Sequence, residues 1–210
     1  YVNIDTVPAQ VLIGGDDRAN RNVIQDAHSY GMAHAIFVGQ SVHGAGSSCQ
    51  IDGNLVGVTE DGFGTAGNDY GLMLESTSCV VHLNRFAGNS YDPIWINGGN
   101  NNVLRNNVIG LIPYGFNLGA VNYGVGIRVE GNNNVIGGSV FDADPLQYEN
   151  TIEYMQGPGI VVQYGSGNTI RGNTIVYNNV GVGGDDMDID LNYDGPTAND
   201  MSDADSGPNL

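Results

Sequence analysis

The sequence predicts an all-β solenoid, a parallel β-helix of about six coils with roughly 23 residues per coil plus loop insertions. Three observations predict it. A motif of asparagine, any residue and an apolar residue recurs along the chain. Two further short apolar runs keep a fixed place relative to that motif. Glycine, with 33 of 210 residues, and asparagine, with 26, are in excess, which favours turns over helices.

The asparagines of the motif each start one strand. They recur at steps of 32, 30, 23, 43 and 23 residues, so the two steps of 23 give the period and the longer steps contain insertions. Equivalent residues of successive coils stack about 4.8 Å apart. We therefore expect the side-chain amides to bond to one another along the axis, a structural role rather than a ligand-binding one. The predicted ladder is Asn22, Asn54, Asn84, Asn107, Asn150 and Asn173.

Two more strands complete each predicted coil. The second strand begins five residues before most of the ladder asparagines, and the third is an alternating run between turn residues. The third-strand runs are 36–38, 72–74, 94–96, 127–129, 160–162 and 189–191. Residues 1–191 are thus predicted as β-helix and 192–210 as an acidic loop or cap rich in Asp, Gly and Pro. Because the sequence starts at Tyr1 and ends in a loop-like run, we expect it to be cut from a longer chain.

The charge of the chain limits its partners. The formal net charge is −17, with six arginines and no lysine, so nucleic acid and anionic membrane surfaces are poor partners, and we expect no nucleic-acid binding. No apolar run reaches the roughly 18 residues of a transmembrane helix, which excludes membrane insertion.

The two cysteines fall at the same place in successive coils. Cys49 and Cys79 each lie five residues before a ladder asparagine. Stacked positions are close enough for a disulfide, and closing a loop of this length stabilises a chain by roughly 3–4 kcal/mol. The alternative is two small apolar residues in a core column. The coincidence favours the bridge, and with it an oxidising, extracellular or cell-surface location.

The repeat resembles a known group of proteins. The Asn-x-Ile motif, the Ile-Gly-Gly runs at 13–15 and 136–138 and the Gly-Asn-Thr-Ile run at 172–175 are similar to secreted right-handed parallel β-helix repeat proteins of the pectate-lyase-like superfamily. The acidic tail resembles the end of such repeats in large bacterial surface proteins. The resemblance implies a right-handed coil. It implies no single function, because the superfamily includes lyases, hydrolases, epimerases, adhesins and spacers.

Two outward-facing columns are candidate sites. Asp52, His82 and Arg105 follow inward residues of the second strand and form weak candidates for acid–base chemistry on a sugar, or a charge ladder on a solvated face. In the third strand the outward column contains large apolar residues beside an arginine. A loop, a protein partner or a glycan could cover this second column, which is Phe37, Met73, Trp95 and Arg128.

The tail carries a pattern of Ca²⁺ ligands. Asp190, Asn192 and Asp194 fit the first half of a Ca²⁺ loop, D-x-N-x-D-G, whereas Met201 at the twelfth position excludes an EF-hand. The alternatives are a shorter Ca²⁺ turn and a solvated acidic cap.

The enzyme signatures of the superfamily are incomplete here. Epimerases of this group carry Asp-Pro-His-Glu, but Asp92 and Pro93 are followed by Ile94 and Trp95, and the lysine of the hydrolase signature is missing. The sequence therefore favours a non-catalytic extracellular module, structural or adhesive, of a larger surface or filamentous assembly, which binds other copies or surface proteins and stacks end to end. The alternative is a polysaccharide-active enzyme or glycan-binding module.

Overall fold

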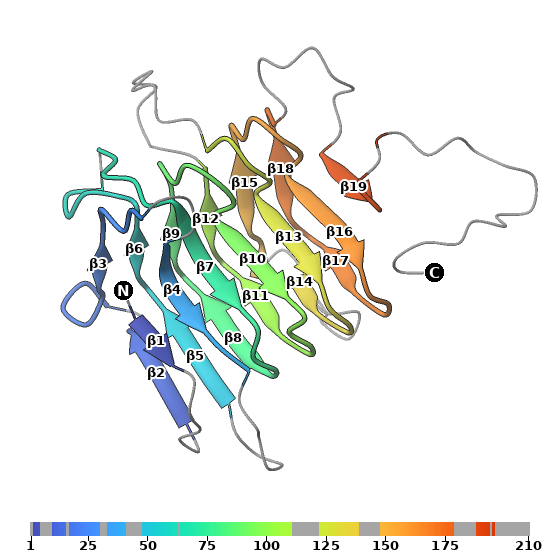
Figure 1. Cartoon of the computed structure of the whole chain (residues 1–210), viewed down its shortest axis with the longest axis horizontal. Coiled ribbons are helices and arrows are strands. Elements are labelled where there is room, and N and C mark those ends of the chain that lie inside the picture. The colour runs from blue at the N-terminus through green and yellow to red at the C-terminus, as the bar shows by residue number, and fades with distance from the viewer. Residues whose placement is uncertain are drawn as a thin grey trace, which may run out of the picture.

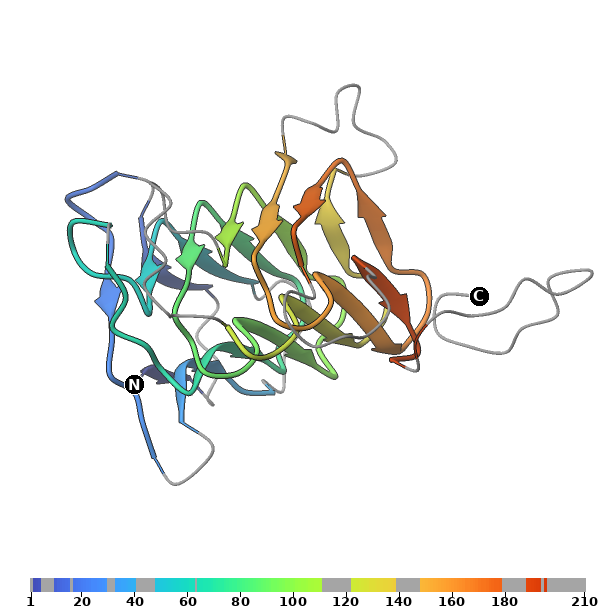
Figure 2. The same cartoon turned by 90° about the horizontal axis from the view of Figure 1, so that it is seen from above.

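The computed structural model describes residues 2–4, 10–15, 17–29, 33–40, 48–62, 64–110, 122–138, 148–178, 188–193 and 195. Within these residues the chain forms three parallel sheets and no α-helix (Figure 1). The view from above shows the sheets surrounding a common interior, with successive coils following one another along the long axis (Figure 2).

Each sheet takes one strand from every coil. The first sheet contains, in spatial order, β1 (Val2–Ile4), β4 (His34–Val38), β7 (Tyr70–Leu74), β10 (Ile94–Asn97), β13 (Ile127–Glu130), β16 (Ile160–Tyr164) and β19 (Ile189–Leu191). The second contains β2 (Gln10–Gly14), β5 (Ser48–Asp52), β8 (Cys79–His82), β11 (Val103–Arg105), β14 (Val135–Gly137) and β17 (Thr169–Arg171). The third contains β3 (Val23–Ile24), β6 (Leu55–Val56), β9 (Arg85–Phe86), β12 (Val108–Ile109), β15 (Thr151–Glu153) and β18 (Thr174–Val176).

The strand register stacks like residues on like. Ile94 pairs with Leu72 on one side and Ile127 on the other, so that branched aliphatic side chains form continuous inward columns. These columns are buried and make up one core that runs the length of the described coils. Burial of each such side chain stabilises the fold by about 1.5–3 kcal/mol. The predicted parallel β-helix of about six coils is confirmed, and β1 adds a strand that the repeat did not identify.

The ladder asparagines lie at the corner between the second and third sheets. Each donates its side-chain amide to the side-chain oxygen of the next, at distances from 2.8 to 3.1 Å. Most of the amides also donate to a backbone carbonyl of the preceding coil, for example Asn84 to the oxygen of Ile51 at 2.7 Å. The corner turns tightly through left-handed backbone, as at Leu83 with φ 56° and Asn106 with φ 57°. The amide side chains thus satisfy the buried polar groups of this corner.

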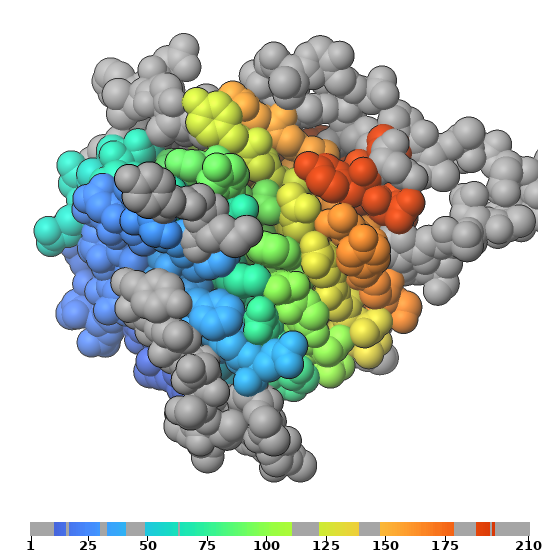
Figure 3. All heavy atoms as spheres, viewed as in Figure 1, coloured from blue at the N-terminus to red at the C-terminus, as the bar shows by residue number. Residues whose placement is uncertain are grey.

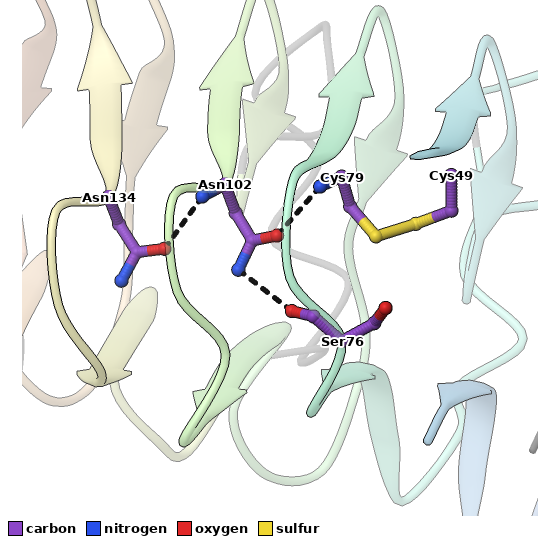
Figure 4. Close-up of a disulfide and its surroundings, with 5 residues drawn as sticks. All are labelled: Cys49, Ser76, Cys79, Asn102 and Asn134. Carbon is purple, nitrogen blue, oxygen red and sulfur yellow. Dashed lines mark hydrogen bonds between the residues drawn. A yellow bond between two sulfur atoms is a disulfide. The ribbon is translucent and has the colours of Figure 1, made fainter. Parts of the chain in front are cut away.

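Cys49 and Cys79 form a disulfide, as the sequence predicted, with Cα atoms 4.5 Å apart. Both are buried and are paired across β5 and β8. The bridge stands in line with a second row of asparagines, which precede strands of the second sheet (Figure 4). Asn134 accepts a hydrogen bond from the backbone N–H of Asn102 at 2.9 Å, and Asn102 accepts one from that of Cys79 at 2.8 Å.

A third row of asparagines follows the third sheet. Asn68 donates to the side-chain oxygen of Asn89 at 2.9 Å, and the backbone N–H of Asn89 donates to Asn122 at 2.9 Å. One ladder was predicted from the sequence, but the structure has asparagine rows at three corners. The asparagine excess is therefore mostly a property of the turns.

Candidate functional site

The outer face of the first sheet is turned toward the viewer in Figures 1 and 3, where successive coils appear as successive bands of colour. The outward column predicted from the third strand runs along it in continuous register. Its members differ in exposure. Met73, Val161 and Asp190 are buried, whereas Phe37, Trp95 and Arg128 are half-buried. Other residues of the same chain therefore cover Met73, Val161 and Asp190, and the rest of the column keeps some exposed surface.

An array of rings lies on the same face. His34 of β4 stacks on Tyr70 of β7 with ring centroids 4.9 Å apart, and Tyr70 stacks on Tyr91 at 4.8 Å. Trp95 of β10 is tilted against Tyr70 at 6.1 Å, and Phe37 is tilted against His34 at 6.1 Å. We call these five rings the aromatic strip. The parallel register produces it, because His34 and Tyr70 are direct partners in the sheet.

Tyr91 ends the ring stack on the side of the later coils. The register places Gly124 beside it in the next coil and Gly157 in the coil after that, and the N–H of Gly157 bonds to the oxygen of Gly124 at 3.2 Å. A Cβ atom on Gly124 would collide with the carboxylate of Asp92 and lie 2.9 Å from the backbone carbonyl carbon of Tyr91, so the turn that carries Tyr91 packs closely against this glycine. Tyr91 itself keeps 44% of its surface exposed.

Arg128 adjoins the strip. Its Nε donates to Asp92 Oδ2 at 2.7 Å and its Nη1 donates to Gln163 Oε1 at 3.1 Å. Its guanidinium also lies over the rings of Trp95, at 5.9 Å, and Tyr193, at 5.0 Å. Tyr193 follows β19, and Figure 3 shows the red residues of this segment against the yellow and orange coils. The start of the acidic tail therefore packs against the strip.

Four carboxylates, which we call the acidic rim, lie near enough to the strip or to Arg128 for their charges to act on these groups: Asp69 and Glu75 on His34, Asp92 on Tyr70, and Glu130 on Arg128. Asp69 accepts hydrogen bonds from His28 Nδ1, at 2.9 Å, and from the backbone of Ser29 and Ala33. Asp92 accepts one from the backbone N–H of Val125 at 2.7 Å in addition to that of Arg128. These two carboxylates are thus held in place by the fold.

The environment shifts the titration of several groups on this face. Burial lowers the pKa of His34, an effect that the carboxylates of Glu75 and Asp69 partly oppose. Burial raises the pKa of Tyr70 and the pKa of Glu130. Burial would lower the pKa of Arg128, but the hydrogen bond and charge of Asp92 outweigh it and raise that pKa. At neutral pH, His34 is therefore uncharged and Arg128 is charged.

The other outward column lies on the second sheet. Asp52, His82 and Arg105 are in adjacent register, and His82 Nδ1 lies 3.0 Å from Asp52 Oδ1. Asp52 is buried, which corrects the expectation of a solvated face, and it also accepts a hydrogen bond from Gln50. Arg105 instead lies over the ring of Tyr148 at 5.1 Å. The three predicted residues are neighbours in the sheet. Among these three, the described contacts join Asp52 to His82 and do not include Arg105.

The predicted Ca²⁺ residues are partly outside the described structure. Asp194 is outside it, and Asn192 follows β19. The carboxylate of Asp190 accepts hydrogen bonds from the backbone N–H groups of Tyr193, at 3.1 Å, and Gly195, at 3.4 Å. Among the described residues no group of three or more His, Cys, Asp or Glu side chains is placed to hold a metal. Calcium binding remains a prediction.

His34, Tyr70, Tyr91 and the acidic rim were not identified from the sequence. The predicted strand runs began at residues 36 and 72, two positions after the ring residues. Extending the third-strand alignment backwards by two residues aligns His34 with Tyr70, so a signal was present for these two. Nothing in the repeat marks Tyr91, which precedes its strand and reaches the strip through the turn.

The chain belongs to the right-handed β-helix family, because residues 11–193 match the family model described as a right-handed β-helix region. This match confirms the handedness that the resemblance implied. No curated protein and no solved structure matches the chain. Helices long and apolar enough to cross a membrane are absent from the described residues.

Proposed function

We propose that this chain is a non-catalytic, adhesive β-helix module of an extracellular protein, and that it binds glycan chains on the aromatic strip. The observation that carries the proposal is the exposed Tyr91 at the end of the ring stack, in a strip that also contains Trp95 and adjoins Arg128. Aromatic rings with a polar edge are suited to a ligand that has an apolar face and hydroxyl groups.

The hydrogen bonds of Asp69 and Asp92 leave these two carboxylates without a free role in acid–base chemistry. General acid–base chemistry on a sugar commonly uses two carboxyl groups, one protonated and one free to attack or to activate water. Asp69 and Asp92 are both occupied by hydrogen bonds from His28, Arg128 and backbone amides. The buried disulfide supports an extracellular location, because such bridges persist in oxidising compartments.

The experiment uses the only tryptophan of the chain as a reporter. Trp95 lies in the strip, so a glycan that binds there changes its fluorescence. We expect titration with a panel of oligosaccharides to give a saturable change, and Tyr91→Ala to weaken binding about tenfold through loss of the exposed ring. No shortened or unsaturated product should form during long incubation.

Tyr177→Ala is the matched control. Tyr177 is 66% exposed and stacks on Tyr154 at 5.4 Å beyond the third sheet, away from the strip. We expect this variant to bind as the wild type does. Equal loss in both variants, or the absence of binding to any glycan, would contradict the proposed site, and released products would contradict a non-catalytic role.

A further inference from the structure

We infer that the glycan bound by this face is an uncharged polysaccharide and not a polyuronate or a sulfated chain. The inference rests on the proposed function and specifies its ligand. Three features of the strip carry it: the sign of the charge around the rings, the occupied hydrogen-bonding edge of the arginine, and the acceptors offered by the acidic rim.

The charge around the rings is negative. The four carboxylates of the acidic rim lie near the strip or Arg128, whereas in the described part of the chain Arg128 is the arginine whose contacts reach the strip. His34 adds no positive charge at neutral pH. An approaching chain of carboxylates is therefore repelled at this face, and the formal charge of −17 on the whole molecule adds to the repulsion.

Arg128 cannot serve as a carboxylate clamp. A guanidinium recognises a carboxylate through parallel N–H donors, and this geometry needs a free edge. Here Nε is bonded to Asp92 and Nη1 to Gln163, while Trp95 and Tyr193 lie against the guanidinium. Its charge is neutralised at 2.7 Å by Asp92. The guanidinium beside the strip is thus already used within the protein.

The acidic rim suits the hydroxyl groups of a neutral sugar. Carboxylate oxygens accept hydrogen bonds and donate none when ionised. Sugar hydroxyls can donate to them, whereas a uronate carboxylate cannot. Glu75 accepts one hydrogen bond from Asn97, at 3.1 Å, which leaves further lone pairs on this carboxylate. Ring stacking at Tyr91 and the acceptor of Glu75, which the strand register places beside Asn97 at the other end of β10, therefore favour an uncharged chain.

The test compares neutral and charged sugars that are matched in linkage and stereochemistry where possible. β-1,4-Mannohexaose and β-1,4-hexamannuronate share their linkage and stereochemistry and differ at C6, and hexagalacturonate can be compared with its methyl ester. Cellohexaose and xylohexaose complete the neutral group. Titrations follow Trp95 fluorescence in a chelating buffer, so that no divalent cation bridges the carboxylates. We expect every uronate to bind at least about tenfold more weakly than the tightest neutral sugar.

Salt and one charge variant separate repulsion from a general loss of fit. Raising the ionic strength should strengthen uronate binding and leave neutral binding unchanged, because salt screens repulsion between exposed charges. Glu130→Gln should raise the affinity for uronates about threefold to tenfold and should not raise the affinity for neutral sugars, because it removes a charge together with one acceptor oxygen of the acidic rim. Glu153→Gln, at the end of β15 in the third sheet, is the matched control and should change neither.

The outcomes are distinguishable. Uronate binding as tight as neutral binding, or uronate affinity that falls with salt, overturns the inference and leaves the proposed glycan site standing. Failure of every sugar to bind overturns the proposed function itself. Tight neutral binding with weak, salt-strengthened uronate binding supports both.

Discussion

The backbone N–H of Cys79 donates to the side-chain oxygen of Asn102 at 2.8 Å, so the disulfide occupies the place that asparagines occupy in later coils. Asn102 in turn is followed by Asn134, and Asn134 by Asn168 at 3.1 Å. The earlier coils of this column are linked covalently and the later ones by hydrogen bonds. Both devices tie successive coils together at the same corner.

The first prediction concerns the disulfide and the asparagine hydrogen bonds that take its place in later coils. Replacing both cysteines by alanine should lower the free energy of unfolding by about 3–4 kcal/mol, the value expected for a bridge closing a 30-residue separation. Replacing both by asparagine should cost about 1 kcal/mol less, because an asparagine side chain in place of Cys79 could bond to Asn102. Urea unfolding measures both variants. Equal losses would mean that the column does not accept a longer ladder.

The second prediction concerns the asparagine ladder. Asn84→Ala removes the acceptor for the backbone and side-chain amides of Asn54, both of which are buried. We expect a loss of about 2–4 kcal/mol in unfolding free energy. Asn22→Ala, at the more exposed start of the ladder, should cost less than about 1 kcal/mol, because water replaces its partners. Similar losses at the two positions would contradict the importance of burial.

The third prediction compares two glycines that both have positive φ. Gly98, with φ +77°, has no atom within 4 Å of the place where a Cβ would stand. Gly98→Ala should therefore lower the free energy of unfolding by about 1–2 kcal/mol, which is the cost of placing an alanine in left-handed backbone. At Gly110, with φ +90°, a Cβ would collide with the carbonyl oxygen of Glu153 in the next coil. Gly110→Ala should cost about 3 kcal/mol or more, because backbone of two coils must separate.

Thermal and urea unfolding distinguish these two glycine variants. If Gly98→Ala were as destabilising as Gly110→Ala, the close approach of the coils would not explain the difference between the positions.

The fourth prediction concerns pH and His34. Burial sets its folded-state pKa below the ordinary value of 6.5, so the unfolded chain binds this proton more readily. The stability that neutral His34 contributes is complete above pH 6.5 and is lost as the pH falls through the lowered pKa. Chemical unfolding at about pH 7.5 and about pH 5.0 should show a smaller loss in His34→Gln than in the wild type. An equal loss would exclude His34 as a source of the pH dependence.

Much of the fold could be predicted because a β-helix repeats itself. A residue such as Ile94 stacks on its equivalents, so one period places the strand, its inward side and the ladder at once. Cys49 and Cys79 could be paired for the same reason. The strip was harder to predict, since Tyr91 precedes its strand by three residues and its ring position depends on a turn. A charge ladder on a solvated face was one of the two interpretations for Asp52, and the structure buries this residue.

By itself, the sequence determined the three-strand coil, the register and the disulfide, because each follows from residues that recur at one spacing and must stack on their copies. The tertiary structure alone decided which outward side chains are exposed and which are buried or bonded to other groups of the protein. It buried Met73, engaged Arg128 with Asp92 and Gln163, and left Tyr91 exposed. These outcomes depend on turns and on segments distant in the chain, whose side chains meet only after the coils have stacked.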